Sequence, residues 1–253
     1  MDDSALLDLA LALVEQAAAA IMRVRAAGFS VAAKADDTPV TIADMQAEAI
    51  ITAGLRAAVP DIPVVAEEEV AAGCVTASGA QYWLVDPLDG TREFAAGRQE
   101  FAVNIGLIRG GVAVLGAVAS PALHEVHYGA RGLGAFRRRQ GETVRISARR
   151  APSEGLTVMA SRHYAADPDL AALLATYKVA SLTNIGSALK FLRLAEGAAD
   201  FYPRLGRTME WDTAAPQAVL EAAGGCVLTT SSEPLRYGKK NFENPDFYAW
   251  GLR

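Results

Sequence analysis

The chain has 253 residues, of which 51% are hydrophobic and 21% charged, so it can form one large domain or two small ones around a sizeable core. Its formal net charge of −5 argues against non-specific binding to nucleic acid polymers. The two cysteines, Cys74 and Cys226, lie far apart and outside any Cys-x-x-Cys pair, so we expect free thiols in a reducing compartment. None of the three histidines shows the spacing of a zinc site.

The N-terminal segment predicts an amphipathic packing helix that begins after Ser4 as N-cap and ends at Gly28. Its acidic start, Met1-Asp2-Asp3, differs from a signal peptide, which begins with basic residues. The apolar run at residues 9–14 is too short to cross a bilayer. We therefore expect no membrane span and a cytoplasmic protein.

A polar loop is expected at residues 34–41, and a helix over 43–58. Asp44 lies in the first turn of that helix, where a carboxylate complements the helix dipole. A short strand over 62–66 leads directly into Glu67-Glu68-Glu69. Three acids after a buried strand indicate either a solvated loop or a carboxylate placed beside a metal ion.

The most informative stretch is Asp86-Pro87-Leu88-Asp89-Gly90-Thr91, which follows an apolar strand predicted over residues 81–85. Proline and glycine predict a rigid turn that aims two carboxylates at one point, which favours a cation between them. Gly90 allows close backbone approach, and Thr91 adds a hydroxyl and an N–H for phosphate. The hexapeptide therefore indicates either a phosphoryl-hydrolysis site or an ordinary surface turn.

The rest of the chain divides into two halves. Residues 1–150 are predicted to form an α+β subdomain that contains the metal-binding loop. The part of this half that follows the strand at 81–85 shows an antiparallel pattern. Its further predicted strands cover residues 101–108, 112–120, 124–128, 134–138 and 143–146. Residues 151–253 alternate strands and helices, which predicts an α/β subdomain that completes the active site. Its predicted strands cover 156–160, 179–184, 199–202 and 226–229, and its predicted helices 168–177, 187–196 and 213–223.

Two charged features allow a structural and a functional interpretation. Asp212 precedes the helix at 213–223, so it is either an N-cap or a third carboxylate brought to the Asp86 loop from the second half. The run Arg137-Arg138-Arg139 is interpreted as a solvated patch rather than a nucleic-acid site.

Taken together, these features resemble the inositol monophosphatase superfamily of Mg²⁺-dependent, lithium-sensitive phosphatases. Three motifs in the right order carry the resemblance, which covers nearly the whole chain: Ala66-Glu67-Glu68, Asp86-Pro87-Leu88-Asp89-Gly90-Thr91 and Trp211-Asp212-Thr213-Ala214-Ala215. The resemblance implies a layered αβαβα sandwich. Ala66 departs from the Gly or Ser frequent in relatives, and Pro216, expected in the first turn of the last helix, departs from a small residue.

Within the superfamily, the chain is most similar to the 3′(2′),5′-bisphosphate nucleotidases. The segments that suggest this are Phe101-Ala102-Val103-Asn104-Ile105, Gly186-Ser187-Ala188-Leu189-Lys190-Phe191, Ala195-Glu196-Gly197 and Tyr202-Pro203-Arg204-Leu205-Gly206. This likeness implies removal of the 3′-phosphate of adenosine 3′,5′-bisphosphate, giving AMP. An inositol or fructose 1,6-bisphosphate phosphatase, and a catalytically inactive metal- or phosphate-binding regulator, stay open as alternatives. The expected partner is a small phosphorylated substrate, and the sequence leaves monomer and homodimer open.

Carried over by position, the resemblance implies a role for each motif residue. It assigns Glu67, Asp86 and the Leu88 carbonyl to one Mg²⁺, with Asp86, Asp89 and Asp212 on a second and a weaker third ion near Glu67. Asp44 would accept a hydrogen bond from Thr91 and so orient a water, which Glu68 would help to position. The N–H groups of Gly90 and Thr91 would hold the scissile phosphate. Ser187, Lys190 and Arg204 would contact the rest of the substrate, the last two through a second phosphate.

Overall fold

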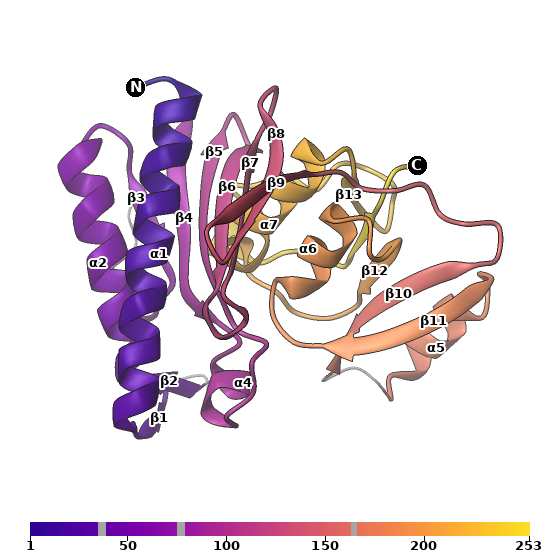
Figure 1. Ribbon diagram of the computed structural model, residues 1–253, viewed down its shortest axis with the longest axis horizontal. Helices are drawn as coiled ribbons and strands as arrows, with labels where there is room; N and C mark the ends of the chain where they lie inside the picture. The colour runs from indigo at the N-terminus through magenta and orange to yellow at the C-terminus, as the bar shows by residue number, and fades with distance from the viewer. Residues whose placement is uncertain (35–38, 75–78, 163–165) are drawn as a thin grey trace.

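A computed structural model describes residues 1–34, 39–74, 79–162 and 166–253 of the chain. The elements lie in five layers, which alternate helix, sheet, helix, sheet and helix from one side of the molecule to the other (Figure 1). This arrangement confirms the predicted αβαβα sandwich.

The first two layers come from the N-terminal half. Helices α1 (Asp3–Ala27) and α2 (Ile42–Ala58) pack side by side on a seven-stranded sheet. The sheet strands are, in spatial order, β3 (Val64–Ala66), β4 (Gln81–Asp89), β5 (Ala102–Arg109), β6 (Val112–Ser120), β7 (Glu125–Ala130), β8 (Gly134–Arg139) and β9 (Glu142–Ile146). Only β3 and β4 run parallel, so this sheet is the antiparallel meander that the sequence predicts.

The apolar stripe of α1 explains its place in the core. Its buried residues are Leu6, Leu7, Ala10, Leu11, Leu13, Val14, Ala17, Ala20, Ile21 and Val24, which recur at helical spacing. By length and composition α1 could also cross a membrane, but this stripe packs on the sheet, as in the core helix of a soluble protein. The N-cap is Asp2 rather than Ser4, because the Asp2 side chain accepts from the Ala5 N–H. Gly28 ends the helix as predicted.

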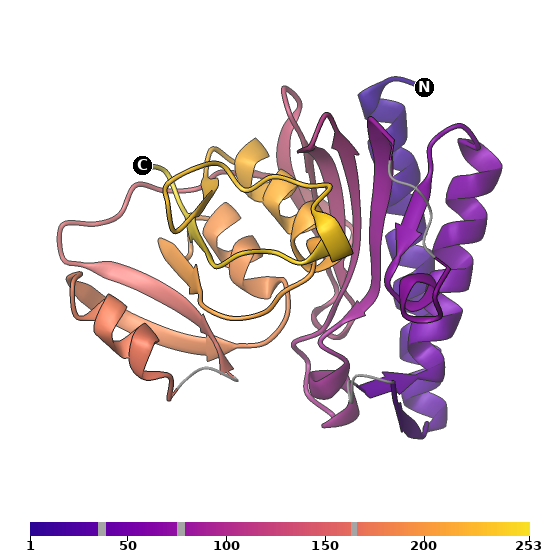
Figure 2. The same cartoon turned by 180° about the vertical axis from the view of Figure 1, so that it is seen from behind.

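The other three layers come from the C-terminal half. Helices α6 (Leu189–Ala195) and α7 (Glu210–Ala222) lie between the two sheets, and α5 (Pro168–Leu174) covers the outer face of the second (Figure 2). The second sheet contains, in spatial order, β11 (Val179–Ile185), β10 (Leu156–Ser161), β12 (Phe201–Arg204), β14 (Phe247–Trp250) and β13 (Cys226–Thr229). Its β10–β11 and β10–β12 pairs are parallel, which confirms a partly parallel sheet. The proposed division of the chain near residue 150 stays a prediction.

The remaining elements are short. They are β1 (Val31–Ala33), β2 (Pro39–Thr41), α3 (Glu67–Ala71), α4 (Thr91–Ala95), η1 (Pro121–Leu123) and η3 (Lys240–Phe242). The expected loop at 34–41 is partly wrong, because Pro39–Thr41 pairs with β1; residues 35–38 lie outside the described residues. The three acids at 67–69 begin α3 and are therefore not a loop.

Helix α7 lies unusually close to the seven-stranded sheet. A Cβ added to Gly106 or Gly116 would stand 2.7 Å from the Ala215 N or 2.3 Å from its O, so only glycine fits at these sheet positions. The helix begins at Glu210, three residues earlier than predicted, which places Pro216 inside it rather than in its first turn. The N-terminal end of α7 packs on β4 and β5, where Trp211 and Ala214 share an apolar cluster with Leu84 and Ile108.

Candidate active site

The Asp86 motif forms a β-bulge rather than a turn after the strand. Strand β4 continues to Asp89, but Asp86 faces Asn104 and Asp89 faces Ala102, so β4 carries one extra residue. Bulges re-aim side chains, and here both carboxylates leave one strand within three residues. The Leu88 N–H donates to Asp86 Oδ1 at 3.0 Å, which fixes the orientation of that buried carboxylate.

Gly90 then turns the chain away from the sheet. Its φ of 91° lies in the left-handed region, and an added Cβ would stand 3.0 Å from the Glu100 carbonyl oxygen. Thr91 follows as the first residue of α4. This geometry agrees with a backbone that a ligand can approach closely.

Asp44 and Thr91 are in contact, although they are 47 residues apart in the sequence. The Thr91 hydroxyl lies 3.0 Å from Asp44 Oδ1. The other Asp44 oxygen, Oδ2, accepts from the Thr41 N–H at 2.8 Å and from the Thr41 hydroxyl at 2.7 Å, which completes the N-terminal cap of α2. One oxygen of Asp44 therefore caps α2 and the other meets Thr91, while the role of this pair toward a water stays a prediction.

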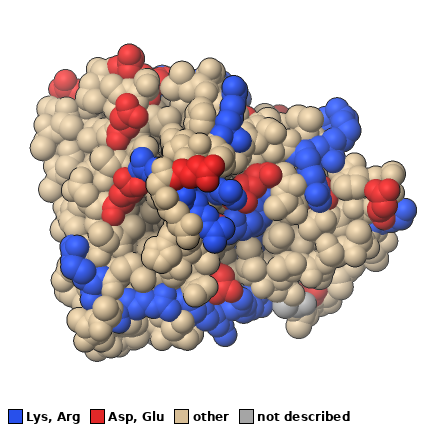
Figure 3. Space-filling view, viewed as in Figure 1, with Lys and Arg blue, Asp and Glu red and all other residues tan. Residues whose placement is uncertain are grey.

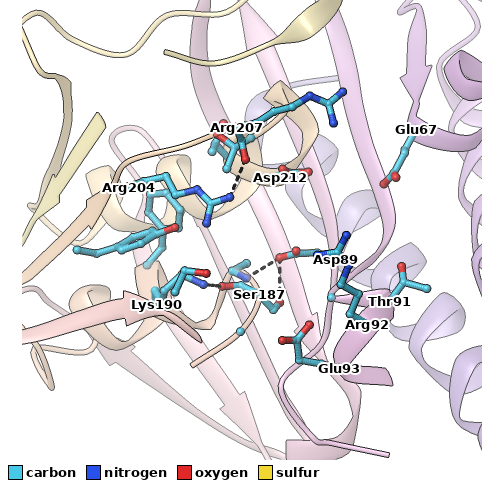
Figure 4. Close-up of a pocket in the computed structure, with 18 of the residues that line it drawn as sticks. Glu67, Asp89, Thr91, Arg92, Glu93, Ser187, Lys190, Arg204, Arg207 and Asp212 are labelled. Carbon is cyan, nitrogen blue, oxygen red and sulfur yellow. Dashed lines mark hydrogen bonds between the residues drawn. The ribbon is translucent and has the colours of Figure 1, made fainter. Parts of the chain in front are cut away.

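Asp212 is fixed in the same way as Asp44. It is the third residue of α7 rather than its N-cap, and its Oδ2 accepts from the Met209 N–H at 2.9 Å. Asp89 also has one held oxygen, since its Oδ2 accepts from the Ser187 hydroxyl at 2.9 Å and the Ala188 N–H at 2.5 Å. In both aspartates one oxygen sets the orientation and the other can bind a cation (Figure 4).

Helix α3 brings Glu67 and Glu68 to the same site. Its N-cap, Ala66, has no capping side chain, and the buried Glu48 of α2 takes that role. Glu48 Oε2 accepts from the Glu68 N–H at 2.7 Å, and its Oε1 from the Glu69 N–H at 2.9 Å. The Lys34 ammonium lies 2.7 Å from Glu67 Oε1 and 2.6 Å from Glu68 Oε1.

The carboxylates repel one another electrostatically. Burial, followed by the charges of Glu67, Asp89 and Asp212, holds the pKa of Asp86 well above its ordinary value. Burial and then the Asp89 and Glu67 charges raise the pKa of Asp212 to about 8. Burial lowers the pKa of Lys34, but the Glu67 and Glu68 carboxylates outweigh this and raise it. The charges of Lys190 and Arg204 also oppose the rise in the pKa values of Asp89 and Asp212, but both pKa values stay raised.

The donor set fits Mg²⁺. Carboxylate oxygens and a backbone carbonyl are hard ligands, and Mg²⁺ is bound by one or two carboxylates together with substrate phosphate and water. Glu67, Asp86, Asp89 and Asp212 act on one another's pKa, so they lie close enough to share cations. Cations would also remove the repulsion that raises those pKa values.

A cavity of about 390 Å³ opens in front of these carboxylates (Figure 4). Eight of the twelve predicted site residues line it: Glu67, Asp89, Gly90, Thr91, Ser187, Lys190, Arg204 and Asp212. The other four lie directly behind: Asp44, Glu68, Asp86 and Leu88. The structure therefore brings all twelve together, while their chemical roles stay predictions.

Four basic side chains line the cavity, namely Arg92, Lys190, Arg204 and Arg207. Lys190 and Arg204 lie on the side away from Glu67, whereas Arg92 lies beside Asp89 and Thr91 (Figure 4). Lys190 is buried and donates to the Ser187 carbonyl at 2.5 Å and more weakly to the Ile185 carbonyl, so it is not a solvated helix residue. Burial lowers the pKa of Lys190 to about 8. Arg204 donates to the backbone carbonyls of Gly206 and Arg207 at 3.3 and 2.6 Å. Arg92 and Arg207 are exposed at the cavity.

Sequence reasoning missed Lys34, Glu48 and Arg207. Lys34 and Glu48 act through contacts with α3, 20 or more residues away, which no local pattern reveals. The charge of Arg207, three residues after Arg204, was a visible signal of a basic loop.

A separate cluster contains Glu125, His127 and Glu196, whose ligand atoms lie within 4.8 Å of one another. Arg193 donates to Glu196 Oε1 at 2.8 Å and to Glu125 Oε2 at 2.9 Å, so a guanidinium already neutralises both acids. The predicted solvated patch, Arg137 to Arg139, is partly exposed and ion-paired, because its arginines pair in chain order with Glu196, Glu15 and Glu125. Figure 3 shows these charges gathered over β8, β9 and α6. This cluster joins elements and is distinct from the candidate active site.

Comparisons with known proteins identify the family of the chain. Residues 2–249 match the model of the inositol monophosphatase family. A curated relative from Salmonella typhimurium, the 3′(2′),5′-bisphosphate nucleotidase CysQ, is 43% identical over 93% of this chain and 95% of its own. The crystal structure of CysQ from Bacteroides thetaiotaomicron matches with a TM-score of 0.81 and 31% identity, covering 98% of both chains. An inositol monophosphatase structure from Thermotoga maritima matches with a TM-score of 0.80 and 26% identity, covering 96% and 91%. The chain belongs to the inositol monophosphatase family.

Proposed function

We propose that the protein is an Mg²⁺-dependent phosphatase that hydrolyses the 3′-phosphate of adenosine 3′,5′-bisphosphate to AMP and phosphate. One observation carries this proposal: the same cavity is lined by carboxylates and by basic side chains, with Lys190 and Arg204 across it from Glu67 (Figure 4). The acidic side suits metal ions and the phosphate that reacts, and the basic side suits a second phosphate. The 43% identical relative is named a 3′(2′),5′-bisphosphate nucleotidase, and this name supports the same substrate.

The metal-binding side would hold two Mg²⁺ ions, with a third, weaker ion near Glu67. Glu67, Asp86 and the Leu88 carbonyl would hold one, and Asp86, Asp89 and Asp212 the other. Bound in this way, Mg²⁺ lowers the pKa of a water and neutralises charge on the leaving oxygen.

The remaining residues orient the reactants. The Thr91 hydroxyl would accept a hydrogen bond from the attacking water and hold its own proton toward Asp44 Oδ1. Glu68, held by Glu48 and Lys34, would help to position that water. The N–H groups of Gly90 and Thr91 would donate to the scissile phosphate.

The basic side would recognise the second phosphate. Arg207 is exposed at the cavity, and Arg204 holds the backbone of the loop that carries it. Arginine can bind a phosphate through two parallel N–H groups. Lys190 adds positive charge, but its bonds to the Ser187 and Ile185 carbonyls make it a support of the turn before α6.

A comparison of substrates tests this assignment. Arg204→Ala and Arg207→Ala should each lower kcat/KM for adenosine 3′,5′-bisphosphate by about 10–100-fold, because a charged hydrogen bond contributes roughly 1.5–3 kcal/mol. Inositol 1-phosphate has no second phosphate and should be affected much less. Arg98→Ala, an exposed arginine outside the cavity, is the matched control.

Equal losses on both substrates would assign the arginines a structural role. A wild-type enzyme that prefers inositol 1-phosphate or fructose 1,6-bisphosphate would replace the nucleotidase by another phosphatase of the family. No phosphate release from any of the three would refute the enzyme assignment. We further propose that the protein acts in the cytoplasm on this small substrate.

A further inference from the structure

A second cavity, of about 450 Å³, shares no lining residue with the active site. Its walls come from the C-terminal half of α7, the start of β6, β13 and residues 234–236. Figure 2 shows the C-terminal segment of the chain crossing this side of the molecule. The volume lies within the range of small-molecule sites, roughly 300–1,000 Å³.

The cavity has an apolar interior. The side chains that form it are Val112, Ala113, Val114, Ala218, Val227 and Leu235. All of them except Val112 are buried, so they form the floor of the cavity and leave only a small part of their surface open to a ligand. Apolar surface of a ligand that covers this floor leaves water, which is favourable.

The polar part of the wall is already held in place by its own hydrogen bonds. Gln217 Nε2 donates to Glu221 Oε1 at 2.8 Å and to the Leu235 carbonyl at 3.2 Å. Gln217 Oε1 accepts from the Tyr237 hydroxyl at 2.7 Å, and the Leu235 N–H donates to the Val227 carbonyl. A wall that is fixed in this way reduces the ordering that a ligand would otherwise cost.

Charge decides which ligand fits. Arg131 and Arg236 carry two positive charges at the rim and Glu221 one negative charge, which leaves one positive charge. Arg131 pairs only loosely with Glu221, at 3.9 Å. Arg236 makes no ion pair or side-chain hydrogen bond with the residues that the structure describes, although its charge acts on Glu221. A bound anion would neutralise the remaining positive charge at the rim.

We propose that this cavity is a second ligand site, for a small organic anion. The apolar body of the ligand would cover the interior, and its carboxylate, sulfonate or phosphate would bind Arg236 with help from Arg131. An organic cation fits less well, because Glu221 already accepts from Gln217 and faces Arg131.

Fluorescence titration of the full chain with 8-anilinonaphthalene-1-sulfonate tests the proposal, since this probe joins an aromatic body to one sulfonate. Arg236→Ala should weaken probe binding about tenfold through loss of a charge-assisted contact. Cys226→Phe should reduce it further, because the half-buried Cys226 lines the cavity. Arg23→Ala, on the exposed face of α1, and Arg207→Ala, in the active site, should bind the probe like the wild type.

The controls also define failure. Wild-type affinity in both Arg236→Ala and Cys226→Phe would overturn the site. So would loss of binding in Arg207→Ala, which would place the probe in the active site. If Cys226→Phe does not fold by circular dichroism, Arg236→Glu decides, because it reverses an exposed charge and should abolish binding.

Discussion

The Thr91 hydroxyl has one proton and two acceptors, Asp44 Oδ1 and the Leu88 carbonyl oxygen, both at 3.0 Å. Leu88 is a proposed metal ligand. A cation on its carbonyl would compete for that oxygen and leave Asp44 as the acceptor. The metal-binding loop and the Thr91–Asp44 pair would then be ordered together.

Thr91→Ala and Asp44→Asn should each lower kcat by about 10²–10⁴-fold, the usual contribution of a positioned proton acceptor. The double variant should lose little more than either single one, because both residues act on one water. Steady-state kinetics at saturating Mg²⁺ provide the measurement. Thr91→Ser keeps the hydroxyl and serves as the control; a double loss equal to the product of the single losses would show that the two act independently.

Residue identities at the site were predictable, but several roles were not. The carboxylates of Glu67, Asp86, Asp89 and Asp212 follow recognisable motifs. Lys190 could not be placed from sequence, because its direction depends on the carbonyls of the turn before α6.

Helices α2 and α3 form one positioning unit. Asp44 and Glu48 lie one turn apart on α2, so the helix that holds the Thr91 hydroxyl also caps the helix that carries Glu67 and Glu68. Glu48 is buried, and burial, outweighing the backbone N–H groups of Glu68 and Glu69, raises its pKa to about 7. Without Glu48, the N–H groups of Glu68 and Glu69 would lose this hydrogen-bond acceptor.

Glu48→Ala should lower the apparent Mg²⁺ affinity in turnover by about 10–100-fold, as loss of a group that orients metal ligands usually does. Glu48→Gln should lower this affinity less, since its amide oxygen can still accept a hydrogen bond from one of the two N–H groups. Activity titrated against Mg²⁺ gives the apparent affinity. Arg56→Ala breaks a different α2–α3 contact, the pair with Glu69, and should leave that affinity unchanged; an equal effect would mean that general loosening of α3 is responsible.

The strongly periodic elements were the predictable ones. The helices α1 and α2 and the strands β5 to β9 agree with the sequence pattern within a few residues. Strand β14, which pairs with β12 and β13, was not predicted, although Asn244-Pro245-Asp246 before it and Gly251 after it are turn signals. The predicted end of β4 is too early, because Pro87 at the bulge imitates a strand terminator when the partner strand is unknown.

The whole fold concentrates negative charge where its layers meet. Asp86 and Asp89 come from the first sheet, Glu67 from the connection beside it, and Asp212 from the middle helical layer. Without bound cations, burial and mutual repulsion raise the pKa values of Asp86 and Asp212, and burial raises that of Glu68 to about 7. The motifs predicted the ligands, but only the layer packing shows how strongly they repel.

This repulsion predicts that the stability of the metal-free protein depends on pH. Asp212 has a folded pKa of about 8 and Glu48 and Glu68 of about 7, against ordinary values of 3.8 and 4.5. A raised pKa in the folded state means that the folded state binds the proton more tightly than the unfolded state. Proton binding therefore stabilises the fold fully below about pH 4, and this stabilisation is lost as the pH rises toward 8. Mg²⁺ binds the ionised carboxylates and should oppose this loss.

Thermal unfolding at pH 5.5 and pH 8 measures the effect in the whole protein. In EDTA the Tm should fall by about 5 °C or more between the two, since 1 kcal/mol corresponds to about 2–4 °C in a domain of this size. In saturating Mg²⁺ the fall should be much smaller, so the gap between the two curves widens with pH. Asp212→Asn removes one titrating carboxylate and should flatten the EDTA curve, whereas Asp61→Asn, which lies outside the site, should not. Parallel curves in EDTA and Mg²⁺ would show that these carboxylates neither bind the ion nor repel one another as the structure indicates.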